Sequence, residues 1–242
     1  MAKPKLPFRE YEWTPQLAYV VGLLATDGNL SKDGRHITMR SKDIDLMEMF
    51  LSCLGLRNKI GTTIIAPRDG HKGGQYYRVQ FGSVQFYNWL VSIGITPAKS
   101  RTIGPVRIPN RYFRDFLRGH LDGDGTILLY QDTSNQYRGR TYTNLRIYLR
   151  FISASYEHIA WLRKTITNLT CAHGALLHHQ PRTPHYATMW HLQFSKKEAK
   201  QLLNWIYYQP NLPCLKRKWM IAQEAFQLTS NERRRVWSRI PA

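Results

Sequence analysis

Two stretches of the chain decide the fold: VVGLLATDGNL at residues 20–30 and LRGHLDGDGTI at residues 117–127. They align without a gap, with Asp27 over Asp124 and a glycine following each aspartate. The two stretches begin 97 residues apart, at residues 20 and 117. A repeat of this kind indicates a chain built from two copies of one structural unit.

A second match supports the repeat. YRVQFGS at 77–83 is similar to WHLQFSK at 190–196, now 113 residues apart, and an apolar, helix-like segment follows each. The wider spacing means that the second copy carries an insertion between the two matches. We expect it in TSNQYRGRTYTN at 133–144, which is polar and lacks a hydrophobic period.

Each motif lies at the end of an expected helix. Thr14 can cap the first helix with Pro15 in its first turn, and apolar residues recur at helical spacing up to Gly28. In the second copy Pro109 and Asn110 open the helix and Gly125 closes it. Both motifs are therefore expected at helix C-termini.

Strand and helix patterns alternate after each motif. We expect strands at 36–41 and 145–153 and helices at 43–55 and 156–169, followed in each copy by two more strands and a third helix. Arg146, Tyr148 and Arg150 alternate with apolar residues, so this strand has one polar face. The order αββαββα, twice over, predicts an α+β fold with two antiparallel sheets.

The repeat also sets the expected domain boundaries. They are an N-terminal half at 1–100, a linker at 101–108, a C-terminal half at 109–227 and a basic C-terminal tail at 228–242.

The composition favours a polyanionic partner. Lys and Arg total 35 against 16 Asp and Glu, a formal net charge of +19, while 43% of the 242 residues are hydrophobic. A folded core is therefore expected together with nucleic-acid binding. A ribosomal or membrane-surface protein is the alternative, but the basic residues are spread among aromatic and strand-like segments instead of one amphipathic helix.

Cysteine usage and the N-terminus indicate where the protein acts. Cys53, Cys171 and Cys214 are an odd number, lie far apart and match no paired metal spacing, so they are expected to be reduced. The first residues lack a signal-peptide apolar run, and nowhere do about 18 consecutive apolar residues occur. We expect a soluble protein, inside a bacterial cell or an organelle and not secreted.

The motifs at 20–28 and 117–125 resemble those of the LAGLIDADG homing endonucleases, in the single-chain form that carries two motifs. The resemblance covers most of residues 14–227. It implies two pseudo-symmetric halves, each with a saddle-like antiparallel sheet, joined through paired motif helices. It also implies a monomer that cuts both strands of double-stranded DNA across the minor groove and leaves 3′ overhangs.

The residue types of the motif indicate its chemistry. Gly22 and Gly119 lie shortly before each helix end, where missing side chains let two helix backbones touch. Asp27 and Asp124 then meet in one site, and two such carboxylates repel unless cations lie between them. Oxygen ligands of this kind suit Mg²⁺, and Mn²⁺ or Ca²⁺ can take its place for binding. By resemblance, the backbone carbonyls of Thr26 and Gly123 also contact metal.

One motif position differs between the copies. The sixth position, acidic in the family name, is Ala25 in the first copy and Asp122 in the second. Asp122 is therefore expected to be a polar residue at the helix end, not a metal ligand. A calcium loop is excluded because Thr126 and Ile127 stand where that pattern needs further ligands.

The resemblance also implies catalytic lysines. The family places one near each metal, after the third helix, where Lys99 fits the first half and either Lys216 or Lys218 fits the second. Lys42, at a strand-to-helix junction, resembles another pocket position, and its counterpart is Ala154. Each lysine could instead be an ordinary phosphate-contacting or solvated residue.

The polar faces of the strands are expected to bind DNA, since a two-stranded ribbon fits the major groove. The candidate residues are Arg35, Arg40, Lys72, Gln75, Arg78 and Gln80 in the first half and Arg138, Arg140, Arg146, Arg150, Gln180 and Arg182 in the second. Because the two sets differ, we expect a long and asymmetric target.

Other interpretations remain. An RNA maturase, with intron RNA as its partner, would use the same scaffold and charge, and a catalytically inactive DNA-binding regulator could descend from the same fold. The second half also contains a histidine-rich stretch between 173 and 191, but it lacks the paired spacing of a structural zinc site. The presence of both Asp27 and Asp124 favours a nuclease.

Overall fold

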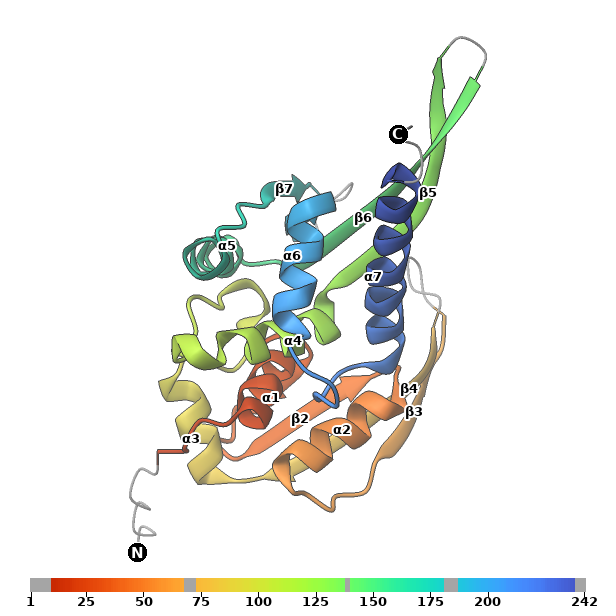
Figure 1. Ribbon diagram of the computed structural model, residues 1–242. Helices are drawn as coiled ribbons and strands as arrows, with labels where there is room; N and C mark the ends of the chain where they lie inside the picture. Colours follow the sequence, from red (N-terminus) through yellow and green to blue (C-terminus); the bar gives the residue numbers. More distant parts are fainter. Residues whose placement is uncertain (1–9, 68–72, 138–139, 181–186, 238–242) are drawn as a thin grey trace, which may run out of the picture.

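The structure is a computed structural model that describes residues 10–67, 73–137, 140–180 and 187–237. Of residues 134–137, 140–143 and 229–237 it describes only the backbone. The elements form two similar halves that follow one another along the chain (Figure 1).

The first half follows the expected order of three helices and four strands. Its elements are α1 (Pro15–Thr26), β1 (Gly28–Leu30), β2 (His36–Ser41), α2 (Ile44–Leu54), β3 (Gly61–Ile65), β4 (Gly74–Gly82) and α3 (Val84–Ser92). The hydroxyl of Thr14 accepts a hydrogen bond from the amide of Leu17 at 3.0 Å, so the expected helix cap is formed. A short 3₁₀ helix, η1 (Lys99–Arg101), follows.

The second half repeats this order and adds one helix. After a second 3₁₀ helix, η2 (Asn110–Tyr112), come α4 (Phe113–Asp124), β5 (Thr126–Tyr137), β6 (Arg140–Ser153), α5 (Tyr156–Thr170), β7 (Ala175–His179), β8 (Met189–Ser195), α6 (Lys196–Ile206) and α7 (Lys216–Trp237). The α+β fold with two antiparallel sheets is confirmed. Helix α7 has no counterpart among the described residues of the first half.

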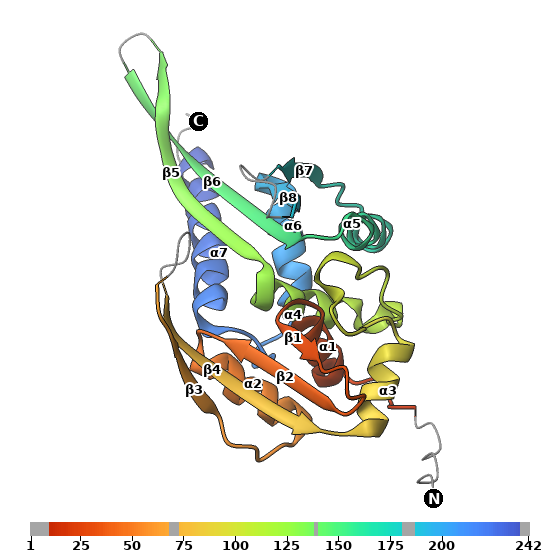
Figure 2. The ribbon, with the colours of Figure 1, turned by 180° about the vertical axis from the view of Figure 1, so that it is seen from behind.

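The two sheets have the same strand order. The first is β1-β2-β4-β3 and the second is β5-β6-β8-β7, with all neighbours antiparallel. The helices lie on one side of each sheet, and the other side faces the viewer in Figure 2. We call that uncovered side the free face of each sheet.

The insertion of the second half lengthens a hairpin. Strands β5 and β6 have 12 and 14 residues, whereas their counterparts β1 and β2 have 3 and 6. The expected insertion at 133–144 therefore extends two paired strands instead of adding an irregular loop. In Figure 1 this hairpin projects beyond the rest of the molecule, and α7 runs beside its base.

Helices α1 and α4 pack against each other at the centre of the molecule. Apolar residues from both helices are fully buried there, including Val20, Leu24, Phe116 and Leu121. Both motifs thus lie in the core that the two halves share. Among the described residues, no helix is both long enough and apolar enough to cross a membrane.

Candidate functional site

The backbones of α1 and α4 touch at two glycines. A Cβ atom on Gly22 would lie 2.1 Å from the carbonyl oxygen of Phe116, and one on Gly119 would lie 2.0 Å from that of Tyr19. Any side chain at either position would overlap backbone atoms of the other helix. Because the helices meet so closely, their C-terminal ends lie side by side.

The two motif aspartates stand at these ends. Asp27 caps α1 and is half-buried, while Asp124 is the last residue of α4 and is more exposed. A Cβ on Gly123 would lie 3.3 Å from a carboxylate oxygen of Asp27, so the end of α4 borders the acid of α1. One site therefore receives a carboxyl group from each half.

Electrostatics within the site favour a cation. Desolvation, and then the charge of Asp124, raise the pKa of Asp27 to about 7, although Lys218 and Lys99 act in the opposite direction. Desolvation also raises the pKa of Asp124. Both carboxylates are disfavoured in their charged form, and a bound cation would reverse this effect.

A buried lysine lies behind each aspartate. The amino group of Lys99 donates hydrogen bonds to the carbonyl oxygens of Gly28 and, at 3.4 Å, Thr26. The amino group of Lys218 donates to the carbonyl oxygens of Gly125 at 2.8 Å and Asp122 at 2.9 Å. Burial lowers the pKa of each lysine to about 8, although the charges of nearby aspartates act in the opposite direction.

Of the two second-half candidates, only Lys218 lies in the site. Lys216 is exposed, whereas Lys218 is buried two residues further along α7. The helix turns the two side chains in different directions. The sequence could not separate them, because the rotation of α7 depends on contacts with the rest of the fold.

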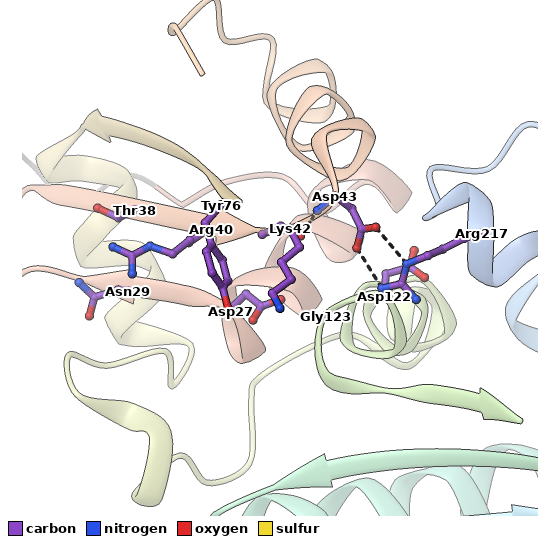
Figure 3. A pocket seen from close by; sticks show the side chains of 11 residues that line it. Asp27, Asn29, Thr38, Arg40, Lys42, Asp43, Tyr76, Asp122, Gly123 and Arg217 are labelled. Atoms are coloured by element: carbon purple, nitrogen blue, oxygen red, sulfur yellow. Dashed lines mark hydrogen bonds and ion pairs between the residues drawn. The ribbon is translucent and has the colours of Figure 1, made fainter. Parts of the chain in front are cut away.

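An open cavity of about 570 Å³ adjoins Asp27 on the side of the first sheet (Figure 3). It is lined by Asp27, Asn29, Thr38, Arg40, Ser41, Lys42, Asp43, Tyr76, Asp122, Gly123 and Arg217. The amino group of Lys42 lies over the ring of Tyr76, 5.1 Å from its centroid. The predicted residues Lys42 and Arg40 are thus brought to the same cavity as Asp27.

An ion pair between the halves borders this cavity and was missed by sequence reasoning. Arg217 at the start of α7 donates from two nitrogens to the two carboxylate oxygens of Asp43, at 3.0 and 2.9 Å (Figure 3). The residues lie 174 positions apart. No local signal in the sequence could have paired them.

Asp122 is buried at the edge of this cavity. One of its oxygens accepts hydrogen bonds from the hydroxyl of Tyr19 at 2.9 Å and from the amide of Leu215 at 2.7 Å. Burial raises its pKa to about 6, against the opposing effect of Lys218. Its contacts hold α1 and the segment before α7 in place.

The donors at the site suit a hard cation. The described residues include no group of three or more His, Cys, Asp or Glu that could hold a metal. An ion here would depend on Asp27 and Asp124, the backbone oxygens of Thr26 and Gly123, and water. Oxygen donors with several waters are the coordination that Mg²⁺ prefers, so the residues fit this ion.

Several predicted DNA-binding residues share the free face of the first sheet. Arg40 lies opposite Arg78 in the register of β2 and β4, and Gln80 lies opposite Thr38. The core residues Met39 and Val79 point to the other side. Gln75 differs from its prediction, because it lies on the side of Val79 and its amide donates to the hydroxyl of Tyr77 at 2.9 Å.

The remaining candidates fall in three groups. Arg146 and Arg150 lie on the free face of the second sheet. Arg35 is exposed in the turn before β2, and Gln180 is exposed just after β7. Lys72, Arg138 and Arg182 lie outside the described residues, as does the side chain of Arg140.

No protein-family model matches the chain, and no curated protein matches it. Among solved structures, it is similar to the LAGLIDADG homing endonuclease I-LtrWI bound to target DNA, with 11% identity, 90% of this chain and 91% of that chain covered, and a TM-score of 0.55. It is also similar to I-SmaMI bound to an uncleaved DNA target in the presence of calcium ions (10% identity, 92% and 93% covered, TM-score 0.56). Full-length DUF199/WhiA from Thermatoga maritima is similar as well (15% identity, 97% and 70% covered, TM-score 0.51). At these identities the likeness concerns the fold, and the chain has the LAGLIDADG fold in its single-chain, double-motif form.

Proposed function

We propose that the protein is a site-specific homing endonuclease that acts as a monomer and makes a magnesium-dependent double-strand break in DNA, leaving 3′ overhangs. The main observation is the pair of carboxyl groups, Asp27 and Asp124, at the touching ends of α1 and α4. The fold is common to homing endonucleases and to WhiA. Nuclease activity is therefore inferred from the two aspartates and not from the fold.

Asp27 and Asp124, with the carbonyl oxygens of Thr26 and Gly123, would hold Mg²⁺. When bound, such an ion lowers the pKa of a coordinated water and stabilises negative charge on the phosphate and on the leaving oxygen. The two acids act as ligands, and no covalent enzyme intermediate is needed. Burial raises the pKa of both acids, and the charge of Asp124 raises that of Asp27 further. Both effects favour ion binding.

Lys99 and Lys218 supply positive charge beside the reacting phosphate. Each amino group is fixed by carbonyl oxygens near the end of a motif helix, so it is positioned before DNA binds. A fixed cation stabilises charge that develops in the transition state at little reorganisation cost. Lys42 and Arg40, which line the cavity beside Asp27, can contact a backbone phosphate next to the cut.

The two free faces would each bind one half of the target in the major groove. The residues that would contact the bases are Arg40, Arg78 and Gln80 on the first sheet and Arg146 and Arg150 on the second. These sets differ, so the target is expected to be asymmetric. The net charge of +19 supports affinity for any DNA, and this affinity should fall as the salt concentration rises.

The test is a cleavage assay on a random duplex library and on plasmids, with Mg²⁺ or with EDTA. Asp27→Asn and Asp124→Asn should each slow cleavage by at least about 100-fold, the loss seen when a charge-stabilising group is removed from an active site. DNA binding in Ca²⁺ should survive both changes. The matched control is Asp45→Asn, which removes an exposed carboxylate on α2.

Cleavage that persists in both aspartate variants, or in EDTA, would refute the proposed mechanism. DNA binding with no cleavage under any condition would favour the inactive regulator. Faster splicing of an intron RNA without DNA cleavage would favour the maturase.

A further inference from the structure

The free face of the second sheet carries exposed apolar side chains. Tyr130 on β5 is 49% exposed, Leu177 on β7 is 42% exposed and Met189 on β8 is 36% exposed. The strand register places Leu128, Tyr148, Ile152 and Ala175 on the same face. The residues form two groups, Leu128, Tyr130 and Tyr148 toward the hairpin and Ile152, Leu177 and Met189 toward the other end, with the row of Arg150 and Gln193 between them. Apolar side chains exposed on one face indicate a binding partner with apolar groups.

The equivalent face of the first sheet is polar. Across β1, β2 and β4 the register aligns Asn29 with Thr38 and Gln80, and next to that row it aligns Arg40 with Arg78. The apolar residues that the register places on this face are Tyr76 and Ile65, both toward one end of the sheet. The two halves therefore share a backbone arrangement but present different chemistry.

The arginines of the second sheet are held by neighbours on the same face. Arg146 forms an ion pair with Asp132 at 2.9 Å, and the guanidinium of Arg150 donates to the side-chain oxygen of Gln193 at 2.5 Å. The rings of Tyr130 and Tyr148 stack with centroids 6.3 Å apart. These contacts fix the polar side chains that lie beside the two apolar groups.

The major groove offers one apolar group to such a surface, the 5-methyl group of thymine. Guanine and adenine instead offer acceptors and donors that suit arginine, glutamine and asparagine. We infer that the second sheet recognises a thymine-rich half-site through its 5-methyl groups, while the first sheet recognises purine edges by hydrogen bonds. This inference rests on the proposed function, because it assumes that the free faces bind DNA.

Replacing thymine by deoxyuridine tests the inference without changing the protein. Duplexes are first selected from a random library by binding to the full chain in Ca²⁺. Deoxyuridine is then placed in one half of a selected site or in the other. Each contacted methyl that is removed should weaken binding by about fourfold, the factor that corresponds to burying one such group. The loss should occur in one half of the site only.

Two protein variants identify the sheet responsible. Leu177→Ala and Met189→Ala remove exposed side chains, so the fold should be kept, and urea unfolding checks this. Each variant should bind thymine DNA about fourfold more weakly and lose the discrimination against deoxyuridine at one position. Thr38→Ala, on the free face of the first sheet, is the matched control and should keep that discrimination.

Equal losses from deoxyuridine in both halves, or none in either, would overturn the inference while leaving the proposed function intact. A chain that selects no duplex at all would overturn both. The inference also fails if Leu177→Ala and Met189→Ala turn a dimer into a monomer in sedimentation without changing DNA affinity. In that case the apolar face is a contact between two copies of the chain.

Discussion

Helices α1 and α4 occupy equivalent places in the two halves, yet their buried side chains differ in polarity. Four buried polar residues of α4 align with four apolar residues of α1, namely Asp115 with Ala18, Arg118 with Val21, His120 with Leu23 and Asp122 with Ala25. Each of the four polar residues is at most 1% exposed. The same backbone geometry is thus reached with an apolar helix on one side and a polar one on the other.

The polar side chains of α4 form hydrogen bonds with neighbouring segments of the second half. The guanidinium of Arg118 donates to the carbonyl oxygens of Pro213 at 2.7 Å and Ile206 at 3.0 Å, and to Asp115 at 2.8 Å. It therefore holds the segment between α6 and α7. The position of this segment matters because it precedes α7, which carries Lys218. In the first half, Lys99 lies in the short 3₁₀ helix that follows α3.

Breaking the buried pair in α4 should have the largest effect on stability. Arg118→Val, which copies Val21 of α1, leaves Asp115 buried without its cation and should lower the free energy of unfolding by about 3–5 kcal/mol. Asp115→Ala with Arg118→Val should cost less than Arg118→Val alone. Urea unfolding measures both. A double variant that is less stable than the single one would show that the pair is not the main contact.

Gly22→Ala tests the contact between the two helices. Its new methyl group would overlap the backbone of α4, so we expect a loss of about 3 kcal/mol, at the upper end for overpacking. Gly119→Ala should cost as much, because its overlap with α1 is equally short. Gly61→Ala on β3, with 3.6 Å to its nearest neighbour, is the control and should stay within about 1 kcal/mol. Equal unfolding midpoints for Gly22→Ala and Gly61→Ala would contradict the packing described for α1 and α4.

A buried pair of histidines, His120 of α4 and His158 of α5, should make the protein sensitive to acid. His158 donates through Nδ1 to the carbonyl oxygen of Gly104 at 2.8 Å, so its Nε2 accepts from Nε2 of His120 at 3.1 Å, and both rings are neutral. Burial lowers the pKa of His158 to about 4 from an ordinary value of 6.5. The contribution of neutral His158 to the free energy of unfolding is complete well above pH 6.5 and is lost as the pH falls toward 4. At pH 5 the loss from His158 alone is about 2 kcal/mol.

The matched variant is His120→Leu with His158→Leu, which gives α4 the leucine that α1 has. Between pH 6.5 and 5 the wild-type protein should lose about 2 kcal/mol more than this variant. Other acids, such as Asp27, titrate in both proteins, so only the difference between the two curves reports on the histidine pair. Parallel curves of unfolding free energy against pH would rule out the histidine pair as the cause.

Replacing Asp122 should have a smaller effect, which concerns the rate of cleavage and not the affinity for DNA. It accepts from the amide of Leu215 and so sets the start of α7, three residues before Lys218. Asp122→Ala should slow single-turnover cleavage by about tenfold, the kinetic equivalent of one net hydrogen bond to a charged group. Asp122→Asn keeps an acceptor oxygen and should restore most of the rate. Equal losses in the two variants would mean that the carboxylate charge matters and not its position.

Local signals explain what the sequence predicted well. Strand β2 occupies His36–Ser41 as expected, and α2 falls within the predicted 43–55, between Asp43 and the left-handed Gly55. Caps, turns and hydrophobic periods act over a few residues, so they can be recognised in one sequence. Caps also predicted that Asp27 and Asp124 each end a helix, whereas the expectation that the two ends meet came from the repeated motif with Gly22 and Gly119.

The features that depend on distant contacts could not be predicted. Nothing near Arg217 indicates Asp43, and the rotation of α7 that separates Lys218 from Lys216 follows from Asp122 and Leu215. The segment at 133–144 looked like an irregular insertion because its alternation is polar on both sides. Pairing between β5 and β6 makes it a hairpin.

The hydrogen bond from Tyr19 to Asp122 also decides which helices can pair. Tyr19 of α1 aligns with Phe116 of α4, which has no hydroxyl. If two C-terminal halves paired with each other, each Asp122 would lose the donor that α1 provides. A C-terminal half made as a separate polypeptide should therefore bind an N-terminal half more tightly than a copy of itself. The preference for the mixed pair depends on one side chain of each helix, Tyr19 and Asp122.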